Sequence, residues 1–332
     1  MIKQRPTVLA GAPWGNPGRS WGLILLATLL SACVSESVRT VDMTPPEQFE
    51  ATQNEDELLD IGIAVFAPNV PDDYDTQIKE NIQPEIRRAE ANYIPYFAKN
   101  LLQSTGNWGA VRVIPRPTHA VDVVVAGKIL SSDGESMGVE ITVTDATGAH
   151  WFTKEYEALA SKYAYDPSIP PDVDPFQSVY KQLADDMLAH RKSLSAEEIL
   201  TIRRTAEMKF AQGFSPDAFA DHISTTEDGE FELKRLPAAD DPMLARVRKI
   251  REREYLFIDT LDEYYETFHR DMYSSYQAWR KATYDESIAL KQLKAQARSR
   301  TIGGAAAIIA GIAAISESNN PYVETSGLVG IV

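Results

Sequence analysis

The sequence predicts an α+β fold: an N-terminal mixed, mostly antiparallel sheet with helices on one face, followed by an all-helical domain with one long amphipathic helix. The continuous apolar run at 58–66 is typical of a buried central strand. Later strand-like segments follow one another across short Gly-bearing turns, which favours hairpins. The long helix is predicted because neither Gly nor Pro interrupts residues 243–300.

The first half of the chain has the pattern of a strand, a helix and then a meander of strands. Apolar residues between 76 and 104 recur at steps of three or four, which indicates a helix that Pro84 and Pro95 should kink or split. Further strands are expected at 110–114, 121–130, 138–145 and 150–158. Turns at 131–135 and 146–148 join the last three strands, so we expect these strands to pair antiparallel.

The second half of the chain is predicted to be helical. A linker rich in Pro and Asp at 163–175 separates an α+β domain at 58–162 from a helical domain at 176–300. Ser195 and Glu198 have the spacing of a capping box, so we expect a helix to begin there.

The longest helix is expected to begin at Asp241-Pro242, with Asp241 as its cap. Its apolar residues recur at nearly alternating steps of three and four, which predicts a coiled-coil-like stripe. The stripe consists of Met243, Val247, Ile250, Phe257, Leu261, Tyr264, Phe268, Met272, Tyr276 and Trp279. It weakens near Thr283-Tyr284, where a bend or a break is the alternative to one helix. The many tyrosines leave two interpretations: a core with wide aromatic coverage, or a second face that binds a partner.

The last segment, residues 301–332, is Gly/Ala-rich and apolar. Its run at 302–315 is shorter than the roughly 20 residues that a membrane-spanning helix needs. Gly303, Ala307 and Gly311 lie four apart, which would place a smooth strip on one helix face. We leave three interpretations open: partial insertion into a membrane, packing in an oligomer, and packing within the chain's own domain.

An apolar run near the N-terminus ends close to the only cysteine, Cys33. Basic residues precede the run at 23–30, and small residues precede the cysteine, which is the arrangement of a secretory signal. The sequence Leu30-Ser31-Ala32-Cys33 resembles the lipobox of bacterial lipoproteins. This resemblance implies that residues 1–32 are a signal peptide and that Cys33 carries fatty acyl chains such as palmitate, which anchor the protein in the lipid bilayer.

The residues after Cys33 bear on where the anchor would sit. More than one acyl chain is needed for stable anchoring, and an acylated lipoprotein cysteine meets that condition. Val34 in place of aspartate implies, by the sorting rule of enteric lipoproteins, an outer-membrane location facing the periplasm. The segment 33–57 is mostly polar and is predicted to be the acylated cysteine with a flexible tether.

The composition excludes several partner classes. The formal net charge is −15, which argues against nucleic acid and anionic lipid as targets. The same charge favours solubility or a basic partner. With 44% apolar and 24% charged residues the chain is expected to be globular. Because the lone cysteine is assigned to the lipid, no disulfide is expected.

Three short motifs carry a further resemblance. They are residues 61–66 (IGIAVF), 121–127 (VDVVVAG) and 142–145 (TVTD) followed by Thr147-Gly148. In this order they resemble the periplasmic domain shared by the curli secretion lipoprotein, the penicillin-binding-protein activator lipoprotein and the N-terminal domain of TolB. The resemblance spans about 100 residues and implies an envelope lipoprotein fold that works through protein contacts. It identifies no partner.

No segment matches a catalytic motif together with its required structural context. Residues 134–138 (GESMG) have the letters of a nucleophile elbow, but they join two predicted strands, so we interpret them as a hairpin loop. The five histidines are scattered, which argues against zinc. Asp166, Asp172 and Asp174 lack the terminal glutamate of a calcium loop and are interpreted as a solvated linker. We therefore expect no catalytic, cofactor or metal site.

Together these patterns predict a non-enzymatic, membrane-anchored envelope lipoprotein that acts as a scaffold, an adaptor or a subunit of a cell-envelope assembly. Its protein partners are not identified, and a homo-oligomer stays open. One alternative is a subunit of an outer-membrane pore or export channel, suggested by the curli resemblance and the segment 301–332. The other is an envelope hydrolase that uses paired carboxylates such as Asp185-Asp186.

Overall fold

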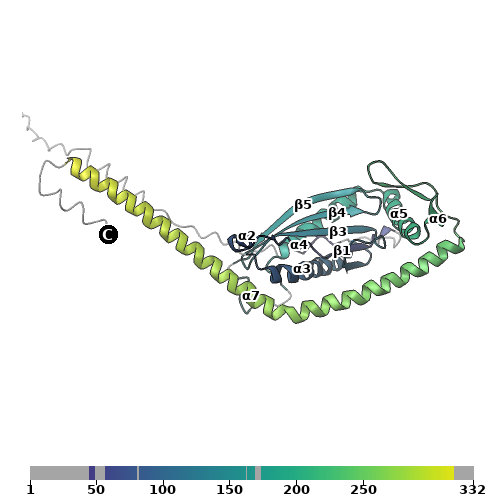
Figure 1. Cartoon of the computed structure of the whole chain (residues 1–332), viewed down its shortest axis with the longest axis horizontal. Coiled ribbons are helices and arrows are strands. Elements are labelled where there is room, and N and C mark those ends of the chain that lie inside the picture. The colour runs from purple at the N-terminus through teal and green to yellow at the C-terminus, as the bar shows by residue number, and fades with distance from the viewer. Residues whose placement is uncertain (1–44, 49–56, 81, 162, 169–172, 318–332) are drawn as a thin grey trace, which may run out of the picture. The chain divides into compact units, whose positions relative to one another are not determined.

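A computed structural model describes residues 45–48, 57–80, 82–161, 163–168 and 173–317, and side chains as far as residue 301. The described elements surround one five-stranded sheet (Figure 1). The predicted signal peptide, Cys33 and most of the predicted tether lie outside the described residues.

The sheet has the strand order β2-β1-β3-β4-β5. Its strands are β1 (Ile61–Ala64), β2 (Val111–Ile114), β3 (Val123–Ser132), β4 (Ser136–Asp145) and β5 (His150–Leu159). Strand β1 is parallel to both β2 and β3, whereas β3, β4 and β5 form an antiparallel meander. The antiparallel pairings are the longer ones, which confirms the predicted fold class with its mixed, mostly antiparallel sheet.

Helices α3 (Pro84–Ser104) and α4 (Gln177–Ser193) pack on one face of the sheet. Pro84 begins α3, where its missing N–H costs nothing, and the short helix α2 (Tyr74–Lys79) precedes it. The predicted split therefore occurs before Pro84. Pro95 lies inside α3, and the helix does not end there.

One core joins the sheet to α3, α4 and the first turns of helix α5 (Ala196–Phe214). Its members include Ile63, Val125 and Ile141 from the sheet and Ile94, Leu183, Met187 and Ile202 from the helices. The core therefore does not divide at 163–175, where the sequence predicted a linker. The apolar faces of α4 and α5 complement the sheet, and Asp174 within that segment is buried.

Short elements follow α5. They are α6 (Pro216–Phe219) and the hairpin of β6 (Ile223–Thr225) and β7 (Phe231–Leu233). The capping box that begins α5 is present: Glu198 N donates to the Ser195 side chain, and Ser195 N donates to the Glu198 carboxylate.

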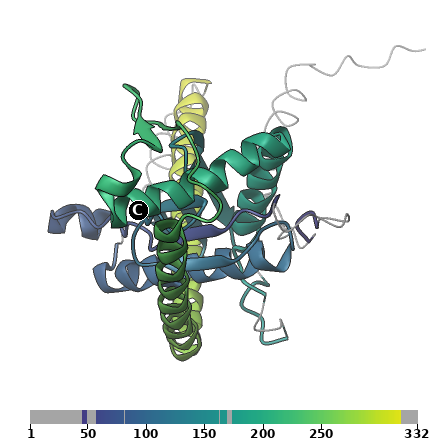
Figure 2. The same ribbon diagram turned by 90° about the vertical axis from the view of Figure 1, so that its right-hand side faces the viewer.

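Helix α7 (Pro242–Glu317) is continuous, so it has no break near Thr283, but Figure 1 shows that it bends along its length. Asp241 caps it, because its Oδ1 accepts from the backbone N–H groups of Met243 and Leu244 at 2.7 and 3.0 Å. The helix packs along β2 and α3, as Figures 1 and 2 show. We call the sheet with α3 and α4 the body. Side chains of α7 from residue 291 to residue 301 are exposed.

Candidate functional site

Helix α7 contacts the body through a row of polar and aromatic side chains, which we call the inward seam. It consists of Arg251, Tyr255, Ile258, Asp262, His269, Tyr276, Arg280 and Thr283. These positions are separated by three, four or seven residues, so they share one side of the helix. Hydrogen bonds, ion pairs and stacked rings make most of this contact.

The most buried member of the inward seam is Arg280. Its Nη1 donates to Asp174 Oδ2 at 2.7 Å, and both side chains are buried. The guanidinium also lies 4.1 Å from the ring centroid of Tyr276 and 5.0 Å from that of Phe176. Burial by itself would lower the pKa of Arg280, but Asp174 together with the surrounding tyrosines outweighs burial, so the pKa is raised. The pair ties α7 to the segment that precedes α4.

A second buried carboxylate, Glu90, joins three elements. It lies on α3 and its Oε1 accepts from Ser132 Oγ of β3 at 2.5 Å and from Tyr276 Oη of α7 at 2.6 Å. Arg87 Nε lies 3.7 Å from the other carboxylate oxygen. Burial raises the pKa of Glu90, although these partners lower it in part. This carboxylate sets the position of α7 relative to both α3 and the sheet.

The β3–β4 turn, where the sequence shows the letters of a nucleophile elbow, packs against α7. Gly134 N donates to Thr283 Oγ1 at 3.0 Å, and Tyr165 Oη donates to Gly134 O at 2.6 Å. A Cβ at Gly134 would lie 1.7 Å from Arg280 O, so only glycine allows this approach. No helix follows the turn, and Ser136 begins β4. The predicted hairpin loop is confirmed.

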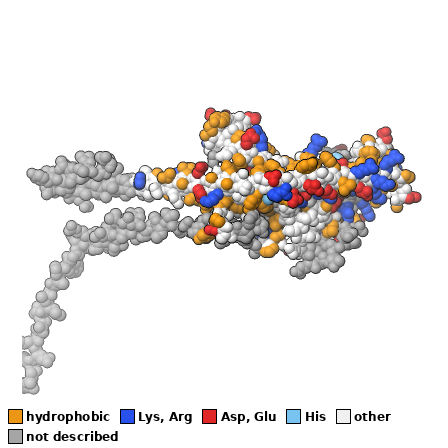
Figure 3. Space-filling view, turned by 90° about the horizontal axis from the view of Figure 1, so that it is seen from below, with side chains coloured by type: hydrophobic (Ala, Val, Ile, Leu, Met, Phe, Trp, Pro, Cys, Tyr) orange, Lys and Arg blue, Asp and Glu red, His pale blue; other side chains and the backbone are white. Residues whose placement is uncertain are grey.

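Another side of α7, about 110° round the helix from the inward seam, carries an apolar row, which we call the outward seam: Phe257, Leu261, Tyr264 and Phe268. Phe257 is 62% exposed and Tyr264 69%, whereas Ile258, the neighbour of Phe257 in the inward seam, is 4% exposed. Figure 3 views the molecule from the side on which α7 lies in Figure 1, and hydrophobic atoms run along it among acidic ones. All four outward residues belong to the stripe predicted from the sequence. That stripe is therefore not simply the face that packs on the body.

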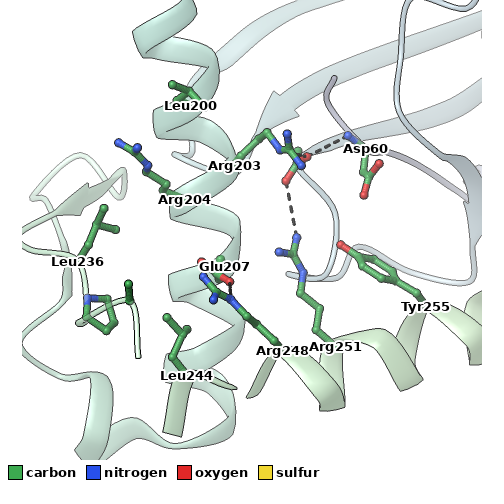
Figure 4. A pocket seen from close by; sticks show the side chains of 13 residues that line it. Asp60, Leu200, Arg203, Arg204, Glu207, Leu236, Leu244, Arg248, Arg251 and Tyr255 are labelled. Carbon is green, nitrogen blue, oxygen red and sulfur yellow. Dashed lines mark hydrogen bonds and ion pairs between the residues drawn. The ribbon is translucent and has the colours of Figure 1, made fainter. Parts of the chain in front are cut away.

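A cavity of about 620 Å³ lies where α5, α7 and the start of β1 and β3 meet (Figure 4). Arg203 and Arg204 of α5 and Arg248 and Arg251 of α7 line it, together with the acids Asp60, Asp122 and Glu207. Its remaining wall is apolar apart from the Tyr255 hydroxyl and consists of Leu200, Leu236, Pro237, Ala239, Leu244 and Tyr255. The strands meet here because β1 and β3 are parallel and begin at the same edge of the sheet.

Asp122 is the buried acid of this cavity. Its Oδ2 accepts from Asp60 N at 2.9 Å, and its carboxylate lies 3.6 Å from Arg251 Nη2 and 4.0 Å from Arg203 Nε. Burial raises the pKa of Asp122 to about 6, against the hydrogen bond from Asp60 N and the two arginines, while the charge of Asp60 adds to the rise. The carboxyl therefore changes charge close to neutral pH.

Three of the four arginines are already engaged by the protein, and Arg203 is paired with Asp122. Arg251 donates from Nη2 and Nε to Ala120 O at 2.8 and 3.2 Å, and Arg248 makes two hydrogen bonds to the Glu207 carboxylate. Arg204 is exposed and has no ion pair or hydrogen bond within the described part of the chain. No serine, cysteine or histidine is among the described residues that line the cavity. The arrangement suits the binding of a charged ligand better than covalent chemistry.

The structure gives the following positions for the residues that the sequence analysis named. Cys33 lies outside the described residues, so its acylation stays a prediction. His190 stacks on Trp151 and His269 on Tyr93. No three His, Cys, Asp or Glu side chains gather to hold a metal ion among the residues that the structure describes. Asp174 is buried against Arg280, so its interpretation as a solvated linker residue is wrong.

The cavity is the feature that sequence reasoning missed. Its charged residues come from four segments, and helix spacing joins only those within α5 and those within α7, not one segment to another. Asp122 lies within one of the three resemblance motifs, where it was interpreted as part of a strand pattern. The pair Arg203-Arg204 gave no distinctive signal, because the chain has another adjacent arginine pair at Arg87-Arg88.

Within the described residues, no helix combines the length and the apolar composition that a membrane crossing requires. Side chains of the Gly/Ala-rich segment beyond residue 301 fall outside the description, although α7 itself continues to Glu317. No protein-family model matches the chain, and no curated protein matches it.

Proposed function

We propose that the chain is a lipid-anchored protein of the bacterial cell envelope that acts as an adaptor, without catalysis of its own. In this proposal the acylated Cys33 holds the protein at a membrane. The outward seam of α7 binds a partner segment whose apolar face is flanked by basic residues. The outward seam is the observation that carries the proposal.

The geometry of the outward seam supports a helical or extended partner. Phe257, Leu261, Tyr264 and Phe268 follow steps of four, three and four, which is the spacing that interlocks with another amphipathic segment. Aromatic residues favour such surfaces because they bury a large area at little cost in side-chain entropy. An apolar row of this length on a single exposed helix face is typical of an interaction site.

The charge of the exposed surface of α7 indicates the chemistry of the partner. Five acids on α7 between 252 and 271 are exposed: Glu252, Asp259, Glu263, Glu266 and Asp271. Only Arg253 and Arg270 are exposed basic residues in the same stretch of the described helix. A second copy of the chain would bring like charges together, which disfavours pairing. A basic segment would meet complementary charge, in agreement with the net charge of −15.

The anchor is tested separately from the partner site. In cells fed an alkyne-tagged fatty acid, the wild-type chain should become labelled and sediment with membranes. The Cys33→Ser variant should lose both the label and the sedimentation. An unlabelled wild-type chain would refute the anchor and leave the partner site to be judged by itself.

The partner site is tested by photo-crosslinking in intact cells. The photo-reactive amino acid p-benzoylphenylalanine replaces Tyr264 of the outward seam in the full-length chain, and Tyr74 on α2 serves as the matched control because it is also 69% exposed. We expect a strong crosslink from position 264, with mass spectrometry assigning it to a segment that is apolar on one face and rich in Lys and Arg. The control should give little.

A charge-reversal variant tests whether charge contributes to the same crosslink. Asp271→Lys should lower the crosslink yield severalfold, because Asp271 lies three residues after Phe268 and seven after Tyr264, so it is beside the seam and repulsion there replaces attraction. Equal yields from positions 264 and 74, or a crosslink to a second copy of the chain, would contradict the proposal. The second of these results would favour the homo-oligomer instead.

A further inference from the structure

The arginine-lined cavity between α5 and α7 has properties that adaptor function does not explain. We propose that it binds a small organic anion: a phosphate monoester or a carboxylate attached to a compact apolar group. The proposal rests on the charge of the lining, on the availability of Arg204, and on the size and polarity of the space. It is independent of the outward seam, which lies on another side of α7.

The lining of the cavity is net positive, whereas the whole protein is net negative. The cavity has four arginines and three acids, whereas the chain carries 33 basic and 48 acidic residues. One of the three acids, Glu207, is already matched by two hydrogen bonds from Arg248. A buried second acid, Asp122, faces Arg203 and Arg251. The lining is therefore net positive, and guanidinium groups on two helices can meet one anion from two sides.

The arginines are held in place before any ligand arrives. The backbone carbonyl of Ala120 accepts from two nitrogens of Arg251, which fixes its guanidinium at the edge of the space. Arg204 projects from the other side of α5 than Arg203 in Figure 4, the side on which Leu236 lies, and it has no ion pair or hydrogen bond within the described part of the chain, so its donors are available to a ligand. Guanidinium groups bind phosphate and carboxylate oxygens in pairs, which makes them the preferred side chains for such anions.

The rest of the cavity suits the body of an organic molecule. Leu236 and Pro237 from the loop before α7 and Leu244 from its first turn form an apolar wall. The volume of about 620 Å³ lies within the roughly 300–1,000 Å³ that is usual for small-molecule sites. A bare inorganic ion would leave this wall unused. The expected ligand therefore has an anionic end for the arginines and an apolar end for the leucines.

The test is calorimetric titration of the full-length chain in neutral detergent with phenyl phosphate, inorganic phosphate and phenyl glucoside. Phenyl phosphate should bind more tightly than inorganic phosphate, and the neutral glucoside should not bind. Arg204→Gln removes one charge-assisted hydrogen bond and should weaken phenyl phosphate about tenfold. The matched control is Arg253→Gln, which changes an exposed arginine of α7 outside the cavity and should have no effect.

Circular dichroism should show that both variants fold, since neither arginine has a described partner to lose. Dihexanoyl phosphatidate then distinguishes the source of the anion: competition with phenyl phosphate indicates a lipid headgroup, and lack of competition a soluble metabolite. Either result supports the site. Equal affinity of the two variants, or no heat from phenyl phosphate up to the millimolar range, would overturn the proposal.

Discussion

The two seams of α7 lie on the same stretch of one helix. Amphipathic patterning predicts an apolar buried side and a polar exposed side, but here the buried seam is rich in polar groups and the exposed seam is apolar. The side that contacts the body carries buried charges and hydroxyl groups, such as Arg280 and Tyr276. The side that faces away carries Phe257 and Tyr264. An apolar stripe therefore does not identify the buried face of a helix when the other face has matched polar partners.

The physical difference between the seams is geometric specificity. Apolar contacts are non-directional and tolerate small shifts. A buried guanidinium needs its carboxylate at one place, and a buried carboxylate needs its donors. The pairs Arg280–Asp174 and Tyr276–Glu90 therefore define one position of α7 on the body. We interpret the inward seam as the contact that positions α7 on the body, and the outward seam as a surface available for binding.

The largest expected loss of stability comes from replacing Arg280 in the inward seam. Arg280→Met leaves Asp174 buried without its cation and should lower the free energy of unfolding by roughly 3–5 kcal/mol, measured by urea denaturation. Adding Asp174→Asn removes the uncompensated charge and should restore most of the loss. A single variant within about 1 kcal/mol of wild type would show that the pair does not stabilise the docking of α7.

A steric change at the same docking point should have a slightly smaller effect. A Cβ at Gly134 would lie 1.7 Å from the backbone of α7, so Gly134→Ala should displace the helix and cost about 3 kcal/mol. The matched control is Gly213→Ala, because no atom lies within 4 Å of its added Cβ and the site is helical. That variant should be neutral or slightly stabilising, by up to about 1 kcal/mol. Equal behaviour of the two variants would contradict the close approach.

The pH dependence of stability tests Asp122, the carboxyl that lies beside Arg251 of the inward seam. The folded-state pKa of Asp122, about 6, lies above its unfolded value of 3.8, so the folded state binds the extra proton. The free energy of unfolding should thus fall by about 2–3 kcal/mol from this group as pH rises from about 4 to about 7.

Asp122→Asn isolates this contribution. Glu90 has a pKa raised in the same direction, but it is unchanged in the variant, so the difference between the two pH profiles belongs to Asp122. Asp60, Arg203 and Arg251 surround the group in both proteins. Parallel profiles over that pH range would show that Asp122 keeps an ordinary pKa.

The smallest pair of effects compares neighbours on the two seams. Ile258→Ala should cost about 2 kcal/mol, because the side chain is buried against Ala64 and Ile114. Phe257→Ala should stay within about 0.5 kcal/mol in the isolated chain, because its side chain is exposed. The exposed variant should instead lose the crosslinked partner. A large stability loss at Phe257 would mean that this seam is covered within the chain itself.

Much of the fold could be predicted from local pattern. The apolar run at 58–66 contains β1, the Gly-bearing turns join β3, β4 and β5, and the capping box begins α5. These features depend on residues close in sequence, where steric and hydrogen-bonding preferences act directly. The core does not divide at 163–175, because the apolar face of α4 packs on the sheet and on α3, which composition alone does not show.

The candidate site was less accessible to sequence reasoning. The arginine cavity assembles four segments that are far apart along the chain, and no local spacing joins Asp122 to Arg203 and Arg251. The buried acid at Asp174 was interpreted as solvated, because its partner Arg280 is more than 100 residues away. Charged residues carry no periodic signal that distinguishes a buried pair from an exposed face.

The linear order of residues was enough for the strands, the caps, the unbroken helix interior and the lipobox-like Cys33 motif, since each depends on a few neighbours. Folding in three dimensions was needed to choose which side of α7 meets the body and to bring four arginines around one cavity. That choice rests on pairing between charges far apart in sequence. The energy of such pairs depends on distance and burial, which only the folded structure gives.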